Sequence, residues 1–245
     1  MADVVLYQFA GDAHTESGSP FCVKVHRALA YKGIAYTPRT VDPATLRRIN
    51  PGVGKVPVLE VGAERIADST AIVDWLDSHH PDPPLRPADP RQRALDRFLE
   101  DWADESLYWY AVSVRWRVDT NFRAFARGAF ASLPPGLATV VPRLLRRAVL
   151  RQLVAQGLGR LPLERVWSQL DTLLDALATW LDDRPFLLGD RLHACDLAVF
   201  GPLRQLALPT LPETAARVRR HDVLVAWLSR VDEATRGTHT VPFTP

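Results

Sequence analysis

The chain has 245 residues, of which 47% are hydrophobic, and its formal net charge is +2. A chain of this size buries a large core and forms one large domain or two small ones. Although basic residues cluster between Arg143 and Arg151, the near-neutral total charge argues against a nucleic-acid binder. No apolar stretch approaches the roughly 20 residues that cross a bilayer, so no membrane span is predicted.

The N-terminal sequence and the cysteine content predict a cytoplasmic location. The start Met1-Ala2-Asp3 lacks the basic and apolar regions of a secretion signal. Two cysteines, Cys22 and Cys195, are too few for a disulfide framework and do not have the spacing of metal ligands. This cysteine usage fits a reducing compartment, and we expect no metal site.

The first third of the chain alternates between strand-like runs and helical patterns. The predicted elements are a strand at 4–9, a helix at 20–32, strands at 34–41, 56–61 and 64–67, and a helix at 69–78. Gly33 terminates the first helix, and a loop with Asn50-Pro51 precedes the third strand. The predicted order is βαβ followed by ββα, which is an α/β domain at residues 1–80.

The rest of the chain reads as helical. Five prolines lie between residues 79 and 90, which excludes a helix there and predicts a semi-rigid linker at 81–90. Helical spacing then recurs at 90–118, 137–157, 163–181, 194–206 and 221–234. A weaker helical pattern at 121–130 is broken by Pro134-Pro135-Gly136. We expect about five helices in an all-α bundle at residues 91–245.

The segment Ser19-Pro20-Phe21-Cys22 lies where the first strand gives way to a helix. Proline is favoured at the first helical position because the missing N–H has no intrahelical partner there. The hydroxyl of Ser19 therefore lies beside unpaired backbone donors at a helix N-terminus. Such a helix end stabilises a phosphate, a carboxylate or a thiolate, and these residues alone do not say which.

Four motifs in order make the chain resemble the cytosolic glutathione transferases. They are Ser19-Pro20-Phe21 before Val23-Lys24-Val25, the run Asn50-Pro51-Gly52-Val53-Gly54-Lys55-Val56-Pro57-Val58-Leu59, the run Asp68-Ser69-Thr70-Ala71-Ile72, and Phe186-Leu187-Leu188-Gly189-Asp190 through Asp196. The first is similar to the serine-type motif of the tau-like classes. Residues 156–160 and 185–190 also resemble the metaxin and Fax-like branch, whose members often have no established catalysis.

The resemblance implies a thioredoxin-like N-terminal domain, an all-helical C-terminal domain and glutathione as co-substrate. It further implies a homodimer, a role in detoxification and thiolate attack on a small hydrophobic electrophile. Ser19 would donate a hydrogen bond to the thiolate, which lowers the pKa of the glutathione thiol and raises the reactive fraction. The alternative is that Ser19 is simply the N-cap of its helix.

Cys22 stands where a Cys-x-x-Cys motif has its second cysteine, and Ser19 replaces the first. Because no dithiol can form, dithiol reductase activity is disfavoured. We interpret Cys22 as a small buried side chain one turn inside the helix. A thiol transferase that uses Cys22 alone remains an alternative.

The other motifs are assigned to the rest of the tripeptide by the resemblance. A cis Val56-Pro57 bond would present the backbone of Val56 to the cysteinyl part of glutathione, as in strand addition. A trans proline at the start of a strand is the alternative. Asp68 would pair with the γ-glutamyl ammonium, and Ser69 at the helix N-terminus would hold its carboxylate or cap the helix.

Two further residues complete the predicted glutathione site. Phe21 follows the proline at the start of the first helix, and Lys55 would neutralise the glycyl carboxylate, with Arg39 as a weaker candidate. Solvated surface charges are the alternative for both basic residues.

Two segments outside these motifs bear on the site. The loop at residues 10–18 is longer than expected before the serine, and its polar composition suggests a mobile flap over the site. His14 in this loop could act as a base, contact the substrate or simply be solvated. Among the aromatic residues of 102–116, Tyr108 and Trp109 are candidates to line the acceptor site, although core packing also accounts for them.

The sequence therefore predicts a glutathione transferase. A non-catalytic binding or scaffold protein of the same fold is the competing hypothesis.

Overall fold

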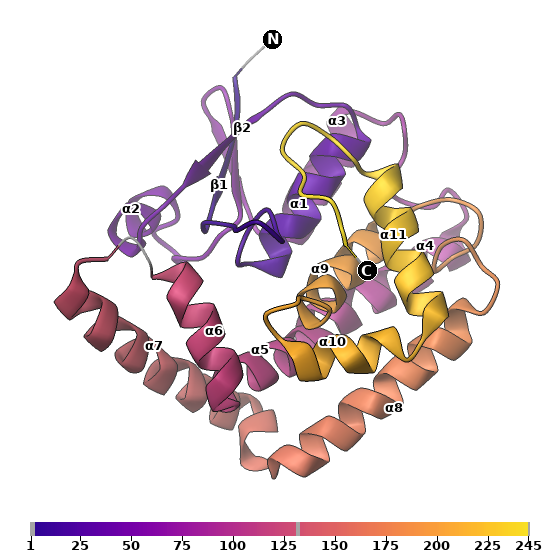
Figure 1. The fold of residues 1–245 in the computed structure, drawn as a ribbon. Helices are drawn as coiled ribbons and strands as arrows, with labels where there is room; N and C mark the ends of the chain where they lie inside the picture. Colours follow the sequence, from indigo (N-terminus) through magenta and orange to yellow (C-terminus); the bar gives the residue numbers. More distant parts are fainter. Residues whose placement is uncertain (1–2, 131–132, 245) are drawn as a thin grey trace.

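The computed structural model describes residues 3–130 and 133–244 (Figure 1). A small sheet flanked by helices forms the N-terminal part, and helices form the rest. The thioredoxin-like domain followed by a helical region, which the sequence predicts, is confirmed.

The sheet has four strands in the order β2-β1-β3-β4. The central strand β1 (Val4–Gln8) pairs parallel with β2 (Thr37–Thr40) and antiparallel with β3 (Val58–Val61). A further antiparallel strand, β4 (Glu64–Ala67), completes the sheet beside β3. Because a parallel pair needs a crossover connection, α1 (Pro20–Tyr31) links β1 to β2.

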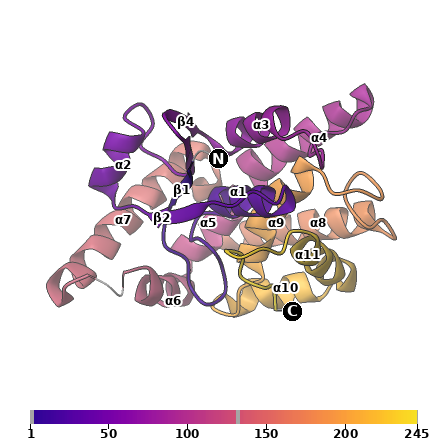
Figure 2. The same cartoon turned by 90° about the horizontal axis from the view of Figure 1, so that it is seen from above.

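Helices cover both faces of this sheet (Figure 2). Leu6 and Leu59 are fully buried under α1 and α3 (Ser69–His79), in the cluster that continues into the helical region. Tyr7 and Val58 point to the opposite face, where α2 (Pro43–Ile49) contributes Leu46. This alternation follows from the two-residue period of side chains along a strand.

The helical region wraps around one fully buried helix, α9 (Ala194–Leu206). The other helices are α4 (Pro90–Trp102), α5 (Tyr108–Arg117), α6 (Asp119–Ala129), α7 (Pro135–Gln156), α8 (Leu163–Leu181), α10 (Pro212–Arg219) and α11 (Asp222–Ala234). A π-helical segment (Ala103–Leu107) joins α4 to α5, and a 3-10 turn (Leu158–Arg160) follows α7.

The N-terminus of α1 lies against the middle of α9. A side-chain carbon at Gly201 would lie 2.6 Å from the carbonyl oxygen of Pro20, so the close approach of the two helices requires glycine there. The start of α1 is therefore held against the helical region as well as against the sheet.

Several predicted boundaries were wrong. The second strand spans 37–40 rather than 34–41, because the N–H of Ile34 still donates to Leu29 at the end of α1. The predicted helix at 90–118 contains the π-helical segment, and α2 and α10 were missed. Both missed helices begin with proline, Pro43 and Pro212, which is a recognised helix start.

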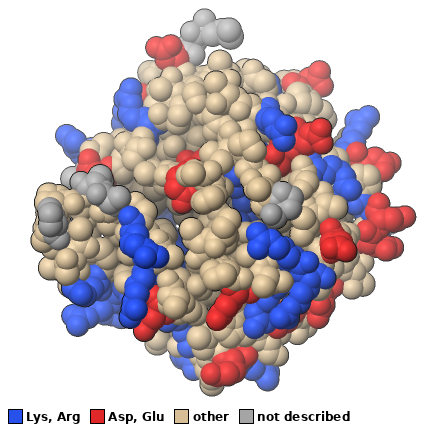
Figure 3. Space-filling model, viewed as in Figure 1, with Lys and Arg blue, Asp and Glu red and all other residues tan. Residues whose placement is uncertain are grey.

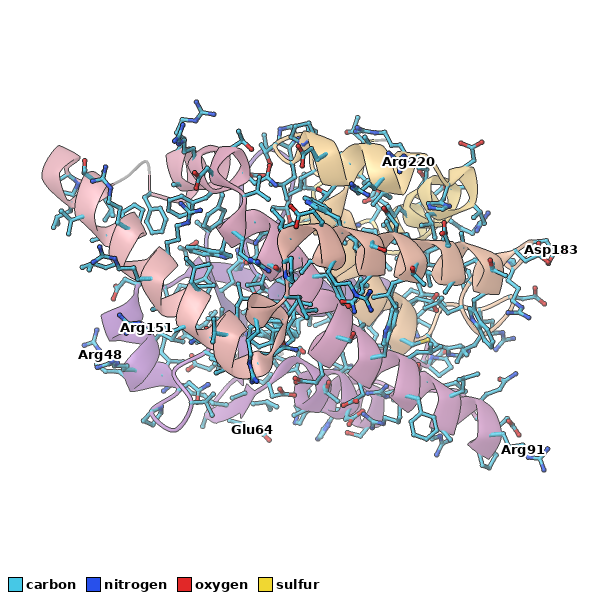
Figure 4. All side chains as sticks on the ribbon, turned by 90° about the horizontal axis from the view of Figure 1, so that it is seen from below. Arg48, Glu64, Arg91, Arg151, Asp183 and Arg220 are labelled. Atoms are coloured by element: carbon cyan, nitrogen blue, oxygen red, sulfur yellow. The ribbon has the colours of Figure 1, made fainter. Side chains whose placement is uncertain are left out.

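Charged side chains of both signs are interspersed on the face that Figure 3 shows, in keeping with the net charge of +2. In the view from below, Arg48, Arg91 and Asp183 lie at the edges of the molecule (Figure 4). The charges that join separate elements of the fold are instead buried.

A buried ionic network joins α1, α3 and α4. Glu100 accepts from Lys24 Nζ at 2.7 Å and from Arg86 Nη1 at 2.7 Å, and its side chain is 3% exposed. Arg86 also pairs with Asp74 and Asp96 at 2.8 and 2.6 Å. Although burial opposes ionisation, Lys24 and Arg86 lower the pKa of Glu100 to about 2. The network thus ties the two parts of the chain together through charge.

We expect Glu100→Gln to destabilise the fold at pH 7 and to flatten its acid sensitivity. A carboxyl with pKa about 2 when folded contributes stability above its unfolded pKa near 4.5, and this contribution is lost as pH falls toward 2. The difference between the folded and unfolded pKa values corresponds to about 3 kcal/mol in the free energy of unfolding. Urea unfolding of both proteins at pH 7 and pH 3 measures it, with exposed Glu105→Gln as the control. An equal pH dependence in Glu100→Gln and wild type would contradict this assignment.

Candidate active site

Strand register brings three predicted site segments to one end of the sheet. Tyr7 lies opposite Val58, and Val58 lies opposite Ala67. Three segments continue from this end of the strands. The loop after β1 leads to Ser19, residues 56–57 directly precede β3, and residues 68–69 directly follow β4. The motifs that are far apart in sequence therefore converge in space, as the resemblance implies.

Side-chain contacts agree with this convergence. Cys22 of α1 packs in one buried cluster with Val56. Two residues further along α1, Lys24 Nζ donates to Thr70 Oγ1 at 3.1 Å. The first two turns of α1 thus contact both the segment before β3 and the N-terminus of α3.

Ser19 precedes α1 with an extended backbone, φ −103° and ψ 122°, and Pro20 is the first helical residue. The Ser19 hydroxyl makes no capping hydrogen bond to the helix, and Ser19 is 8% exposed. Its backbone N–H donates to Ser17 Oγ at 3.2 Å. A capping hydroxyl would bond to an N–H of the first turn, so this geometry does not support a cap by the Ser19 side chain.

Cys22 is fully buried, as the sequence predicts for a packing role. Burial raises the pKa of its thiol to about 11, although hydrogen bonds involving Ser19, Ser17 and the Phe9 backbone lower it in part. Because the thiolate is the reactive form, this position disfavours a thiol transferase that uses Cys22.

The Val56-Pro57 peptide bond is cis, as predicted. Val56 is 7% exposed, and no hydrogen bond within residues 3–130 and 133–244 uses its backbone N–H or C=O. A backbone with both groups unpaired, next to the start of a strand, is suited to pair with an extended peptide. The Lys55 side chain is exposed, and its C=O accepts from Asn50 Nδ2 at 3.0 Å.

Asp68 rather than Ser69 caps α3. The Asp68 carboxylate accepts from the N–H groups of Thr70 and Ala71 at 2.9 and 3.1 Å through Oδ1. The residue has φ +82°, a conformation that L-residues rarely adopt. Ser69 is 3% exposed at the first helical position, so the predicted capping role of Ser69 is wrong. The second carboxylate oxygen of Asp68 has no partner among the described residues and faces solvent with the exposed side chain.

We expect Asp68→Asn to weaken glutathione binding more than it weakens folding. Asparagine retains the capping oxygen but removes the charge that would pair with an ammonium. The dissociation constant measured by calorimetry should rise about 5- to 20-fold, and the melting temperature should change little. In the matched Asp68→Ala variant the cap is also lost, at about 1 kcal/mol of stability. Equal affinities in the wild type and Asp68→Asn would remove this carboxylate from the site.

The aromatic residues of α1 and α5 meet near Ser19. The ring of Phe21 lies 4.7 Å from that of Tyr108, and Tyr108 lies 5.1 Å from Trp109. Burial raises the pKa of Tyr108, which keeps its phenol protonated as a hydrogen-bond donor. The predicted acceptor residues are thus adjacent to the predicted serine segment, and Phe21 faces them.

The loop before Ser19 is anchored, which corrects the prediction of a mobile flap. Thr15, Glu16 and Ser17 are buried, and His14 alone of these four neighbouring residues is exposed. Thr15 Oγ1 donates to the C=O of Ser17 at 3.1 Å. Composition indicated an exposed loop, but Glu16 folds inward to meet two arginines.

Glu16 belongs to a buried quartet with Arg27, Arg204 and Asp232, which we call the ionic quartet. Arg27 pairs with Glu16 and, at 2.8 Å, with Asp232, and Arg204 Nη1 lies 3.5 Å from Glu16 Oε1. All four side chains are at most 3% exposed. The quartet joins the loop to α1, α9 and α11.

The C-terminal segment closes over the ionic quartet. The N–H of Val241 donates to Glu16 at 3.1 Å, and its C=O accepts from Arg27 and Arg204 at 2.7 and 2.6 Å. Figure 1 shows this segment running from α11 back across α1 toward α9. None of these contacts was predicted, because they join residues 37 to 225 positions apart in the sequence.

Sequence reasoning also missed Arg115 of α5 and Gln205 of α9. Arg115 Nη2 donates to Gln205 Oε1 at 2.6 Å, and Gln205 Nε2 donates to the C=O of Gly18 at 3.1 Å. These residues thus reach the backbone next to Ser19. The sole sequence signal was an arginine inside an otherwise aromatic and apolar helix.

Family comparisons agree with this geometry. The model of the "Glutathione S-transferase, N-terminal domain" matches residues 14–84, and that of the "Glutathione S-transferase, C-terminal domain" matches residues 170–231. Together the two matches cover more than half of the chain. The chain belongs to the glutathione S-transferase family. The predicted family membership is thereby confirmed.

Two curated proteins are similar to most of this chain. The isoprene-epoxide–glutathione S-transferase of Rhodococcus sp. (strain AD45) is 29% identical over 197 residues, 77% of this chain and 80% of that protein. "Failed axon connections" of Drosophila melanogaster is 26% identical over 83% of this chain. The chain spans about half the length of that protein, with 50% covered. This match agrees with the predicted Fax-like resemblance.

A solved glutathione S-transferase shares the fold and carries a glutathione derivative. The enzyme from Methylobacterium radiotolerans, in complex with glutathione sulfonate, is 25% identical with a TM-score of 0.62. The superposition covers 99% of this chain and 96% of the other. In the part of our chain that the structure describes, no cluster of His, Cys, Asp or Glu is arranged to hold a metal ion. No helix there has the length and apolarity to span a bilayer.

Proposed function

We propose that the protein is a glutathione transferase in which Ser19 stabilises the thiolate of bound glutathione. One observation carries the proposal: strand register brings the Ser19 hydroxyl, which does not cap α1, the unpaired backbone of Val56 and the N-terminus of α3 to one end of the sheet. Each group matches a different part of the tripeptide. The family match supports glutathione as the co-substrate.

Glutathione would lie extended across this end of the sheet. Its cysteinyl backbone pairs with Val56 beside Pro57, and its γ-glutamyl carboxylate meets the N–H groups of α3 near Ser69. The free oxygen of Asp68 accepts from the ammonium, and the exposed Lys55 neutralises the glycyl carboxylate. This arrangement directs the thiol toward Ser19 at the start of α1.

The acceptor is a small hydrophobic electrophile beside Phe21, Tyr108 and Trp109. The thiolate attacks an electrophilic carbon, the S–C bond forms, and a leaving group such as chloride departs with its bonding pair. The relative from Rhodococcus is described as acting on isoprene epoxide, so an epoxide belongs among the substrates to be tested. There, the S–C bond forms while a ring C–O bond breaks, and the resulting alkoxide oxygen takes a proton from water.

Calorimetry with glutathione, followed by turnover with 1-chloro-2,4-dinitrobenzene and an epoxide, tests the proposal. We expect saturable binding and release of chloride from the aromatic halide. Failure to bind millimolar glutathione would overturn the enzyme assignment. Activity that survives in Cys22→Ser would exclude the thiol transferase that uses Cys22.

A non-catalytic binding protein is the second candidate, and the similarity to failed axon connections favours keeping it. Glutathione binding without turnover on a broad panel of electrophiles would establish it. The homodimer, the cytoplasmic location and a role in detoxification are expected from the family. Sedimentation and cell fractionation test the first two.

A further inference from the structure

Arg115 is a buried arginine without an acidic partner. The structure buries three arginines among residues 3–130 and 133–244, namely Arg27, Arg115 and Arg204. Arg27 and Arg204 each pair with two carboxylates of the ionic quartet. Arg115 is 7% exposed, and among the described residues it forms no ion pair.

The guanidinium of Arg115 has spare hydrogen-bond donors. It carries five N–H groups, and the structure pairs one of them, on Nη2, with the neutral amide of Gln205 at 2.6 Å. Its central carbon lies 5.3 Å from the ring centroid of Phe125 on α6. A guanidinium held between an amide and an aromatic ring is presented for planar, bidentate pairing with an anion.

The surroundings of Arg115 place it beside the proposed acceptor site. It lies seven residues after Tyr108 on α5, which is two helical turns along the same face and about 10 Å away. Tyr108 contacts Phe21, and Gln205 links Arg115 to the carbonyl next to Ser19. Figure 1 shows α5 and α6, which carry these residues, side by side.

Other charges near Arg115 do not neutralise it. Burial lowers the pKa of Arg115 to about 10, and Tyr108 and Asp12 partly oppose this. The Asp12 carboxylate instead accepts from the N–H groups of His14 and Thr15 at 2.7 and 3.1 Å, within the loop. At neutral pH the guanidinium is therefore charged and lacks a counter-ion of its own.

We infer that Arg115 recognises a carboxylate on the electrophile, so that the acceptor is a small organic acid with an apolar body. The inference rests on the proposed function and names the substrate class of the same site. The apolar body lies against Tyr108 and Phe125, and the carboxylate replaces the missing partner of Arg115. The spare N–H groups of Arg115 are not among the buried atoms without a partner in the described part of the chain, so they are accessible to a ligand, and hydrogen bonds to a carboxylate are stronger than those to water or an amide.

Two matched probes test this assignment, 4-chloro-3-nitrobenzoate and its methyl ester. In both, the glutathione thiolate forms the S–C bond at the chlorinated carbon, and chloride leaves with its bonding pair. Each kcat/KM is divided by the uncatalysed rate constant of the same probe, which removes the difference in intrinsic reactivity. The acid-to-ester ratio then reports recognition of the carboxylate alone.

We expect Arg115→Met to lower this ratio about 10- to 100-fold, as loss of a charge-assisted pair does. The control is Arg117→Met, because Arg117 lies on the same helix but donates to the carbonyls of Leu158 and Leu161. The ratio in this control should stay within about twofold of wild type. An unchanged ratio in folded Arg115→Met would overturn the inference and leave the proposed function standing.

Binding and stability give readouts that do not need turnover. Calorimetry compares S-(4-carboxy-2-nitrophenyl)glutathione with its methyl ester, and Arg115→Met should abolish the preference for the acid. No binding of either conjugate would overturn both the inference and the proposed function. Arg115→Met should melt no lower than wild type, since it removes an unpaired buried charge. A lower melting temperature with an unchanged ratio would assign Arg115 a structural role through Gln205.

Discussion

The Ser19→Ala variant is expected to retain bound glutathione while the pKa of the bound thiol rises by about 1 to 2 pH units. A hydrogen bond to a charged group contributes about 1.5 to 3 kcal/mol, and the Ser19 hydroxyl donates to the thiolate but gains far less from the neutral thiol. The N-terminus of α1 stays in place, so part of the stabilisation survives.

The pH dependence separates this effect from a loss of binding. Below the pKa of the wild-type complex, the variant has about 10 to 100 times less thiolate, and kcat/KM falls in proportion. Above the raised pKa the two proteins converge, because glutathione is ionised in both. Thiolate absorbance of the complex and kcat/KM for 1-chloro-2,4-dinitrobenzene, measured across pH, follow the shift.

Two controls accompany Ser19→Ala. Because the Ser19 side chain makes no capping bond, the variant should lose less than the roughly 1 kcal/mol that removal of a helix cap costs. Ser19→Thr keeps a hydroxyl and should restore part of the thiolate. An unchanged thiolate absorbance at neutral pH in Ser19→Ala would show that another group activates glutathione.

Local patterns predicted the part of the site that depends on local geometry. Pro20 fixed the start of α1, and the strand-like runs at 4–9 and 56–61 contain β1 and β3. The cis Val56-Pro57 bond followed from the family resemblance, since a trans proline suits the same residues. Capping of α3 was one of two alternatives for Ser69, and Asp68 makes the cap instead; the sequence does not decide between them, because aspartate and serine are equally favoured N-caps.

The sequence patterns could not predict the buried polar contacts between segments that are far apart in the chain. The polar composition of residues 10–18 suggested solvent exposure, and only the folded chain shows Glu16 meeting Arg27 and the C-terminal segment. Arg115 likewise was not singled out from the sequence. Its burial depends on Gln205 of α9, 90 residues away, which no periodicity within α5 reveals.

We expect Glu16→Gln to destabilise the fold by about 3 to 5 kcal/mol. The substitution preserves shape but leaves Arg27 and Arg204 buried with Asp232 as the single remaining carboxylate of the ionic quartet. It also weakens the acceptor for the N–H of Val241, which holds the C-terminal segment. Against a typical total stability of about 5 to 15 kcal/mol, this loss is large.

Urea unfolding at pH 7 measures the loss, and limited proteolysis reports whether the loop and the C-terminal segment open. Exposed Glu64→Gln, which removes the same charge from the surface of β4, should change stability by less than about 0.5 kcal/mol. If Glu16→Gln lowers the free energy of unfolding by less than about 1 kcal/mol, the two arginines do not need the Glu16 charge to remain buried.

A double variant distinguishes charge imbalance from a simple loss of contacts. Adding Arg204→Met to Glu16→Gln leaves the Arg27–Asp232 pair, at 2.8 Å, with equal numbers of each charge. The double variant should therefore be more stable than the sum of the single losses predicts, by about 0.5 to 3 kcal/mol. Strict additivity would mean that each residue acts through its own packing.

Because the same loop ends at Gly18 and Ser19, a loosened ionic quartet should also lower kcat/KM. The pKa of bound glutathione should not change, which separates this effect from that of Ser19→Ala.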